Sequence, residues 1–189
     1  MKGVIITFNN INIVIGITGG IAAYKACGIV SYLKQQGANI DIIMTKNACK
    51  FITPLTLETL SKNKVIVDMF DEEDYSEVKH ISLARKADLF LIVPATANLI
   101  GKVANGIADD MLSTTIMATK APVIFAPAMN NQMFENPIVQ DNIKKLISYG
   151  HRIIDPAVGH LACGYEEKGK LPKNEEIIDY VKQLIKEKN

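Results

Sequence analysis

The sequence predicts an α/β fold, Rossmann-like, in which helices flank a single doubly wound and mostly parallel sheet. Short, almost wholly apolar runs such as Leu89–Val93 alternate along the chain with longer segments of helical periodicity. Most of the apolar runs end in turns rich in Gly, Thr, Asn or Pro. The composition agrees, because 48% of the residues are hydrophobic, only 6% are aromatic and Trp is absent. Strands that alternate with helices form right-handed βαβ units, which assemble into such a sheet.

The first predicted unit is a strand, a glycine-rich turn and a helix. Ile11–Ile17 is the strand, Thr18–Gly20 is the turn and Ile21–Lys34 is the helix. This order suits the edge of a bound phosphate or flavin, although the turn is not G-x-G-x-x-G and therefore predicts no dinucleotide site. The next strand, Asn39–Met44, ends in Thr45–Asn47, at the sheet edge where ligands collect in such folds.

The remaining elements follow from the same patterns. Thr53 and Pro54 open a helix, because Pro is favoured at the first helical position. We predict helices over Leu55–Leu60, Val78–Asp88, Met111–Ala118, Pro137–Tyr149 and Asn174–Lys188, and strands over Val65–Val67, Val123–Ala126 and Arg152–Ile154.

The stretch from Leu89 to Ala108 is the predicted centre of the fold. Leu89–Val93 is a strand buried on both faces, Pro94 ends its pairing, and Asn98 caps the helical segment that follows. The small residues Ala95–Ala97 let another molecule approach the backbone closely. A buried strand that ends in small residues at a helix N-terminus predicts an anion or cofactor seat, and an ordinary βα turn is the alternative.

Composition excludes several classes of protein. The net charge of +1 gives no field for nucleic acid or an anionic membrane, and no apolar run is long enough to span a bilayer. The first residues lack the pattern of a signal peptide. The three cysteines lack metal-ligand spacing, and Cys27 and Cys49 fall in or beside helical segments, which predicts core or incidental thiols in a reducing cytoplasm. We therefore expect one cytoplasmic domain over residues 1–189.

Residues 155–172 have no clear periodicity and predict a lid or binding loop that carries Cys163. With His80 and Asn130, this thiol makes a set of three chemically useful groups. If the fold brings them together, they supply a base or acid, an amide that holds a carboxylate or enolate-like oxygen, and a proton donor.

Six segments, in this order and spacing, resemble the flavin-dependent cysteine decarboxylases over about residues 13–171. They are GITGGIAAYK (Gly16–Lys25), FITPLTLETLS (Phe51–Ser61), KHISLARKAD (Lys79–Asp88), PATAN (Pro94–Asn98), PAMNNQM (Pro127–Met133) and LACG (Leu161–Gly164). The chain departs from the family pattern at Leu99 and Phe134, which stand for Thr and Trp, and after Cys163, where Tyr165 replaces an Asp.

The resemblance implies an FMN cofactor, bound between the subunits of a homotrimer or of a larger assembly of trimers such as a dodecamer. It implies that the flavin is held by Thr18, Gly19, Gly20, Ile21, Thr45, Lys46, Asn47, Thr96, Ala97, Asn98 and Ala128. It also implies that His80 is the catalytic base, that Cys163 is the final proton donor, and that the substrate contacts Asn130, Met133, Leu161 and Ala162.

The implied reaction converts 4′-phosphopantothenoylcysteine into 4′-phosphopantetheine in coenzyme A biosynthesis. Loss of CO₂ from a cysteine amide leaves a carbanion without an electron sink, and the family solves this by using FMN to oxidise the thiol-bearing carbon to a thioaldehyde. Decarboxylation then gives an enethiolate, which is reduced with a returned hydride and a thiol proton. Lys168 or Lys170 is the expected basic contact to the substrate phosphate. A phosphopantothenate–cysteine ligase on a separate chain is a possible partner.

Two other functions remain open from sequence. A peptidyl-cysteine decarboxylase of the same fold stops at the enethiol and has no use for Cys163 as a donor. A flavin-binding regulatory subunit acts through protein contacts and has no chemical use for His80, Asn130 and Cys163 together.

Overall fold

The computed structural model describes residues 8–70, 78–160 and 166–188, and within them six parallel strands form the central sheet. Their spatial order is β3-β2-β1-β4-β5-β6. The strands are β1 (Asn12–Ile17), β2 (Asn39–Met44), β3 (Val65–Ile66), β4 (Leu89–Ala95), β5 (Val123–Pro127) and β6 (Arg152–Ile153). The doubly wound parallel sheet predicted from the sequence is therefore confirmed.

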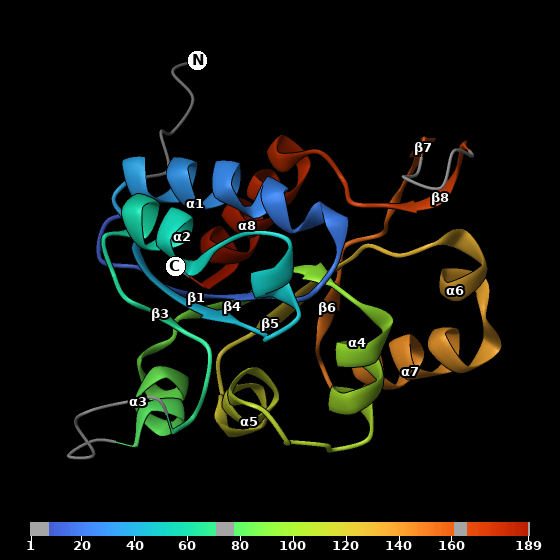
Figure 1. Ribbon diagram of the computed structural model, residues 1–189, viewed down its shortest axis with the longest axis horizontal. Coiled ribbons are helices and arrows are strands. Elements are labelled where there is room, and N and C mark those ends of the chain that lie inside the picture. Colours follow the sequence, from blue (N-terminus) through green and yellow to red (C-terminus); the bar gives the residue numbers. More distant parts are fainter. Residues whose placement is uncertain (1–7, 71–77, 161–165, 189) are drawn as a thin grey trace.

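Helices cover both faces of this sheet (Figure 1). One face carries the 3₁₀ segments η1 (Ile21–Lys25) and η2 (Ala48–Lys50) with α1 (Ala26–Gln35), α2 (Pro54–Ser61) and α8 (Asn174–Lys188). The other face carries α3 (Lys79–Lys86), α4 (Ala97–Ala104), α5 (Met111–Ala118) and α7 (Pro137–Ser148), with the short α6 (Asn131–Glu135) beyond the sheet edge.

The alternation of side chains along each strand builds two separate cores. In β4, Leu91 and Val93 join the core beneath α1 and α8, whereas Phe90 and Ile92 join the core beneath α4 and α5. All four side chains have no exposed surface. Because both faces are covered, the strands read as continuous apolar runs, which is why they are recognisable in the sequence.

The order of the strands reverses between β1 and β4, which sit side by side at the centre of the sheet. The chain leaves β1 toward α1 on one face, and it leaves β4 toward α4 on the other. The two connections therefore diverge and leave a crevice outside the carboxyl ends of these strands, which is the usual ligand position in an open α/β sheet.

The structure corrects three local predictions around β4 and η1. The strand does not stop pairing at Pro94 but continues through a cis Val93–Pro94 peptide to Ala95, which pairs with Pro127 after a shift of register. The N-cap of α4 is Thr96 and not Asn98, so the helix begins two residues earlier than an Asn cap implies. The helix predicted over Ile21–Lys34 begins as the 3₁₀ segment η1.

The predicted irregular lid is also corrected, since its described parts form an antiparallel hairpin. Strands β7 (Ala157–His160) and β8 (Glu166–Lys170) pair with each other in a second sheet. Their residues are short of apolar side chains and lack strict alternation, so no strand signal is visible there in the sequence. Residues 161–165, which include Cys163, lie outside the described part of the chain.

We predict that Ile124→Ala lowers the free energy of unfolding by about 2–5 kcal/mol, because it removes a fully buried side chain from the centre of β5. Ile138→Ala is the matched control, since Ile138 is 72% exposed on α7 and its loss leaves no cavity. Urea unfolding of both variants measures the difference. Equal effects would show that the β5 core does not stabilise the fold in this way.

Candidate cofactor and substrate cleft

A cavity of about 1210 Å³ lies at the carboxyl ends of the central strands. Its walls come from the turns after β1, β2, β4 and β5, from the start of α5 and from the end of β8. A pocket for one small ligand usually measures about 300–1,000 Å³. The cleft therefore has room for a cofactor and a substrate together.

The hydroxyl group of Thr18 joins the ends of β1 and β4 at the floor of the cleft. Its Oγ1 donates to the carbonyl oxygen of Pro94 at 2.6 Å and accepts from the backbone N–H of Thr96 at 3.1 Å. The side chain is 2% exposed. Thr18 thus holds the two turns that form the cleft in a fixed relation.

The two glycines after Thr18 have different surroundings. A Cβ at Gly19 would stand 2.5 Å from the Cβ of Asn47 and 2.9 Å from its carbonyl carbon, so glycine allows the turn after β2 to pack closely. A Cβ at Gly20 would meet only the Cγ2 of Thr96, at 3.9 Å, and Gly20 has an extended backbone that any residue adopts. Gly20 therefore leaves an open cradle facing the cleft.

The structure brings together the residues for which flavin contacts were predicted from the sequence. All of them line the cleft: Thr18, Gly19, Gly20, Ile21, Thr45, Lys46, Asn47, Thr96, Ala97, Asn98 and Ala128. The start of α4 at Ala97 also borders the cleft, and the first N–H groups of a helix are suited to bind a phosphate.

Asn130 and Met133 line the same cleft from the loop after β5. Asn130 is the N-cap of α6, and its Oδ1 accepts from the backbone N–H of Gln132 at 3.0 Å. This hydrogen bond orients the amide with its oxygen toward α6, so the NH₂ group is the end directed away from the helix. An amide held in this way can donate to a substrate carboxylate.

The loop that carries Asn130 is tied to strand β8. The backbone N–H of Met129 donates to the carbonyl oxygen of Gly169 at 3.0 Å, and the Nζ of Lys168 lies 5.4 Å from the ring centre of Phe134. Gly169 has a φ of +135°, and a Cβ there would clash with the carbonyl oxygen of Met129. Only glycine therefore allows this close approach.

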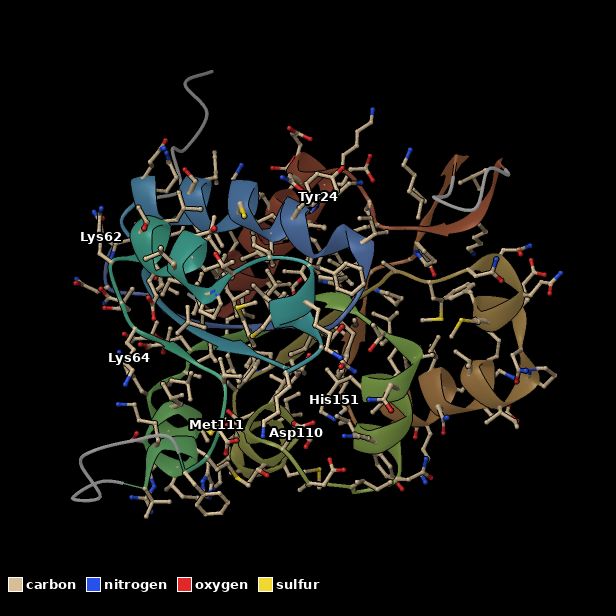
Figure 2. The ribbon with its side chains drawn as sticks, viewed as in Figure 1. Tyr24, Lys62, Lys64, Asp110, Met111 and His151 are labelled. Atoms are coloured by element: carbon tan, nitrogen blue, oxygen red, sulfur yellow. The ribbon has the colours of Figure 1, made fainter. Side chains whose placement is uncertain are left out.

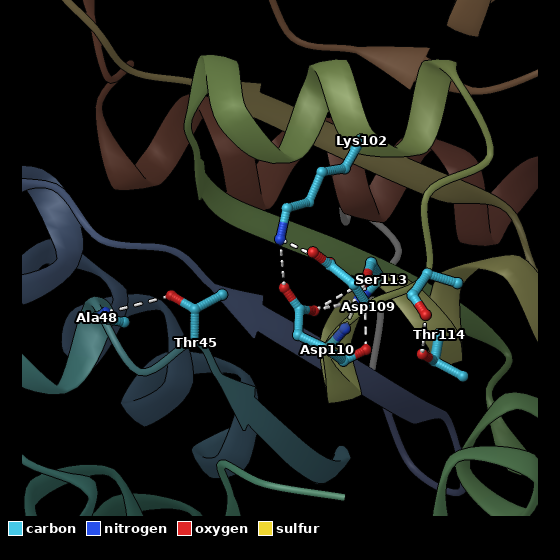
Figure 3. A network of polar contacts seen from close by, with 8 residues as sticks. Thr45, Ala48, Lys102, Asp109, Asp110, Ser113 and Thr114 are labelled. Atoms are coloured by element: carbon cyan, nitrogen blue, oxygen red, sulfur yellow. Dashed lines mark hydrogen bonds and ion pairs between the residues drawn. The ribbon is translucent and has the colours of Figure 1, made fainter.

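Sequence reasoning missed the charged cluster at the start of α5 (Figure 3). The Nζ of Lys102 lies 2.7 Å from Oδ1 of Asp109 and 3.1 Å from Oδ2 of Asp110, and all three residues line the cleft. Asp110 also closes a capping box with Ser113. The signal that could have located it is the Asp-x-x-Ser spacing at a helix start.

The cluster holds Asp110 in its ionised form. Burial by itself raises the pKa of this carboxyl group, but the hydrogen bonds from Ser113 and the adjacent Lys102 ammonium outweigh burial, so the pKa falls below its ordinary value. The hydrogen bonds to Asp109 and Asp110 raise the pKa of Lys102 against the effect of burial. This wall of the cleft therefore has one ammonium group against two carboxylates, which is a formal excess of one negative charge.

Soft and aromatic side chains also line the cleft. Tyr24 borders it on the side of η1, and Met111 borders it beside Asp110 across the sheet, as Figure 2 shows. Within the described ranges, five methionines line the cleft: Met44, Met69, Met111, Met129 and Met133. Thioethers are polarisable and adaptable, which suits contact with a flat aromatic ligand.

His80 is not among the described residues that line the cleft of its own chain, because it lies in the first turn of α3. The other predicted site residues, Leu161, Ala162 and Cys163, lie outside the described residues. Cys27 and Cys49 are half-buried, and burial raises the pKa of both thiols, so neither is activated.

No helix in the described part of the chain is long and apolar enough to cross a membrane. No group of three or more His, Cys, Asp or Glu side chains in the described ranges is arranged to hold a metal ion.

The sheet order and the cleft define a doubly wound α/β protein with a cofactor site at the switch point of its sheet. The flavoprotein family model matches residues 7–186, and the chain belongs to this family.

Relatives of two kinds were found. Over 170 residues, the chain is 51% identical to the coenzyme A biosynthesis bifunctional protein CoaBC of Bacillus subtilis, covering 90% of this chain and 42% of that protein. It thus spans less than half of this relative. A probable phosphopantothenoylcysteine decarboxylase of Streptococcus mutans is 41% identical over 175 residues, which cover 92% of this chain and 98% of the relative.

Two solved structures that are similar to this chain, at lower sequence identity, are also those of decarboxylases. A cysteine-to-serine mutant of a phosphopantothenoylcysteine (PPC) decarboxylase, complexed with pantothenoylaminoethenethiol, superposes with a TM-score of 0.82 at 27% identity, covering 93% of this chain and 98% of that one. The FMN-dependent cysteine decarboxylase SpaF gives 0.82 at 28% identity, with 94% and 98% covered.

The cleft fits an FMN. The open cradle at Gly20 admits a ligand backbone, the start of α4 suits a phosphate, and the methionines provide a soft apolar wall for a ring. Thr18, Gly20, Thr96 and Ala97 would hold the phosphate end.

We predict that Gly20→Ala weakens FMN binding about tenfold or more, because the new Cβ fills the cradle, while the stability of the apoprotein stays unchanged. Gly19→Ala is the matched comparison, and it should lower the free energy of unfolding by about 1–3 kcal/mol through its clash with Asn47. Flavin titration and urea unfolding give both values. Unchanged FMN affinity in Gly20→Ala would place the cofactor elsewhere.

We predict that Asp110→Asn lowers the free energy of unfolding at pH 7 by about 0.5–1 kcal/mol, because Asn keeps the N-cap of α5 but loses the ion pair with Lys102 and the negative charge at the helix start. The folded pKa of Asp110 is depressed, so its contribution is present above the ordinary carboxyl range near pH ~4 and is lost as the pH falls through the folded value. The variant should therefore lose less stability than wild type on acidification. Parallel pH profiles in urea unfolding would contradict this role.

Proposed function

We propose that this chain carries out the FMN-dependent decarboxylation of 4′-phosphopantothenoylcysteine to 4′-phosphopantetheine, a step of coenzyme A biosynthesis in the cytoplasm. The observation that carries the proposal is a single cleft containing both a cofactor cradle at Gly20 and an oriented amide at Asn130. The relatives from Bacillus subtilis and Streptococcus mutans, at 51% and 41% identity, support the choice of substrate.

Each proposed role follows from the chemistry of the residue. The Asn130 amide binds the substrate carboxylate through its NH₂ group, which orients the bond to CO₂. His80 removes a proton from the substrate, since imidazole exchanges protons near neutral pH. Cys163 donates the last proton to the product. Bound FMN supplies the two-electron sink and returns the hydride.

The site is completed by a second copy of the chain. His80 does not line the cleft of its own chain, so a neighbouring copy must supply it if it acts as the base. Large apolar side chains at the cleft are exposed in one copy: Ile21 at 61%, Tyr24 at 59%, Phe70 at 75% and Met133 at 50%. Such a rim is typical of a surface covered by a partner, which supports a homotrimer or an assembly of trimers.

The companion phosphopantothenate–cysteine ligase acts from a separate chain or from a continuation of this one. A peptidyl-cysteine decarboxylase is the second candidate, because an FMN-dependent cysteine decarboxylase, SpaF, shares this fold at 28% identity. A regulatory flavin-binding subunit has no use for Asn130 as a substrate ligand. The higher identity of the coenzyme A relatives supports the small-molecule substrate over the peptide substrate.

We predict that the purified yellow protein converts 4′-phosphopantothenoylcysteine to 4′-phosphopantetheine. Mass spectrometry of the products measures this conversion. Cys163→Ser should accumulate the oxidised enethiol, because decarboxylation precedes the final protonation. His80→Asn should retain flavin but release no CO₂. A yellow wild-type protein that releases CO₂ only from a peptide with a C-terminal cysteine would favour the second candidate.

Mixing variants tests the shared site. His80→Asn and Asn130→Ala should each be inactive alone, because each removes one part of every site. Co-assembled, they should regain part of the activity, since some sites then combine an intact His80 from one copy with an intact Asn130 from another. No recovery in verified mixed oligomers would place both residues in the same copy.

A further inference from the structure

The hydroxyl group of Thr18 has no hydrogen left for a ligand. An ionised phosphate accepts hydrogen bonds, whereas a threonine hydroxyl has a single hydrogen to donate. Thr18 donates this hydrogen to the carbonyl oxygen of Pro94 at 2.6 Å, and its side chain is 2% exposed. Its Oγ1 also accepts from the backbone N–H of Thr96. The hydroxyl group of Thr18 is therefore not a phosphate ligand, although the residue lies at the phosphate end of the cleft.

Thr45 occupies the matching place after the neighbouring strand β2 and differs in this respect. Its Oγ1 accepts from the backbone N–H of Ala48 at 3.2 Å (Figure 3). Among the described residues, no acceptor takes the hydrogen of this hydroxyl group. The hydroxyl of Thr45 can therefore donate to a ligand in the cleft, and that of Thr18 cannot. The two threonines have different roles.

The bonds of Thr18 fix the segment that leads into α4. Pro94 and Thr96 stand on either side of Ala95, so a single Oγ1 holds the backbone before and after this residue. The carbonyl oxygen of Ala95 accepts from the backbone N–H of Ala128 at 3.1 Å. The segment is thus held to β1 by a side chain and to the turn after β5 by a backbone bond.

The helix that follows this segment begins without a side-chain cap. Thr96 is the N-cap of α4, and its side chain makes no capping hydrogen bond. The N-cap residues of α5, α6 and α7, in contrast, each accept from a backbone N–H of their helix. The first N–H groups of α4 border the cleft and suit the flavin phosphate. Their direction is set by the segment that Thr18 holds.

We propose that Thr18 is a positioning residue that gives the cleft its preference for FMN over riboflavin, acting through Thr96 and the start of α4. Without the hydroxyl group, the carbonyl oxygen of Pro94 and the N–H of Thr96 lose their partner, and the segment moves to find others. The N–H groups of α4 then lose their alignment with the phosphate. This assignment rests on the FMN cofactor of the proposed function and is independent of its substrate.

The test compares the binding of FMN and riboflavin to the apoprotein by fluorescence titration. Thr18→Val has a similar shape without the hydroxyl group, and it should lower the ratio of FMN affinity to riboflavin affinity about tenfold or more. Thr18→Ser keeps the hydroxyl group, and its ratio should stay within about threefold of the wild-type value. A general loss of cleft structure weakens both flavins alike and leaves the ratio unchanged.

Thr115→Val is the matched control. Thr115 is fully buried, its Oγ1 donates to the carbonyl oxygen of Met111 at 2.7 Å, and it does not line the cleft. This variant should lose stability and retain the wild-type ratio. If Thr18→Val gives no folded apoprotein, Thr18→Cys replaces it, because a thiol is only a weak donor and acceptor. The ratio should fall in that variant too.

Three results would overturn the proposal: equal losses of FMN and riboflavin affinity in Thr18→Val, an equally large change of the ratio in Thr115→Val, or a wild-type protein without a preference for FMN. The decarboxylation assay is separate. If the wild type does not convert 4′-phosphopantothenoylcysteine but Thr18→Val loses the preference for FMN, the proposed function fails and the positioning role of Thr18 stands.

Discussion

The hydroxyl group of Thr18 is the contact on which the cleft depends. The helices that follow β1 and β4 lie on opposite faces of the sheet. These helices therefore do not hold together the two turns that follow the strands. Thr18 does so by donating to Pro94 and accepting from Thr96. Loss of this buried hydroxyl group would leave two backbone groups without their hydrogen-bond partner. Its contribution to stability is therefore larger than that of either hydrogen bond alone. The cradle at Gly20 and the start of α4 both follow from this junction.

Electrostatics divides the cleft into two parts. At the start of α5, Lys102 pairs with both Asp109 and Asp110, so this wall has a formal excess of one negative charge. At the ends of η1 and β8, Lys25 and Lys170 are unmatched among the described residues. The chain as a whole carries a net charge of only +1, so composition gives no indication of this local excess. A nearly neutral protein can still present a strongly cationic pocket wall.

Sequence alone predicted the layered fold because each strand is a buried apolar run, and Asn39–Met44 and Met111–Ala118 have the predicted bounds. It failed where tertiary structure decides. β4 continues past Pro94, and Ala95 pairs with Pro127 after a shift of register that the sequence does not indicate. The hairpin of β7 and β8 was missed because its residues are short of apolar side chains and do not alternate strictly. The lining of the cleft was predicted mainly through family motifs, whereas the approach of Lys102 to Asp110 depends on the packing of α4 beside α5.

The bond between Met129 and Gly169 has a consequence for how such proteins diverge. The hairpin and the loop after β5 meet backbone to backbone, at a position where only glycine fits, and Lys168 lies against Phe134 beside it. Replacing either segment alone would therefore remove the contacts that it makes with the other segment. In chimeras that graft a hairpin from one relative onto another, the two segments must be transplanted as a pair, and substitutions accepted in one constrain those accepted in the other.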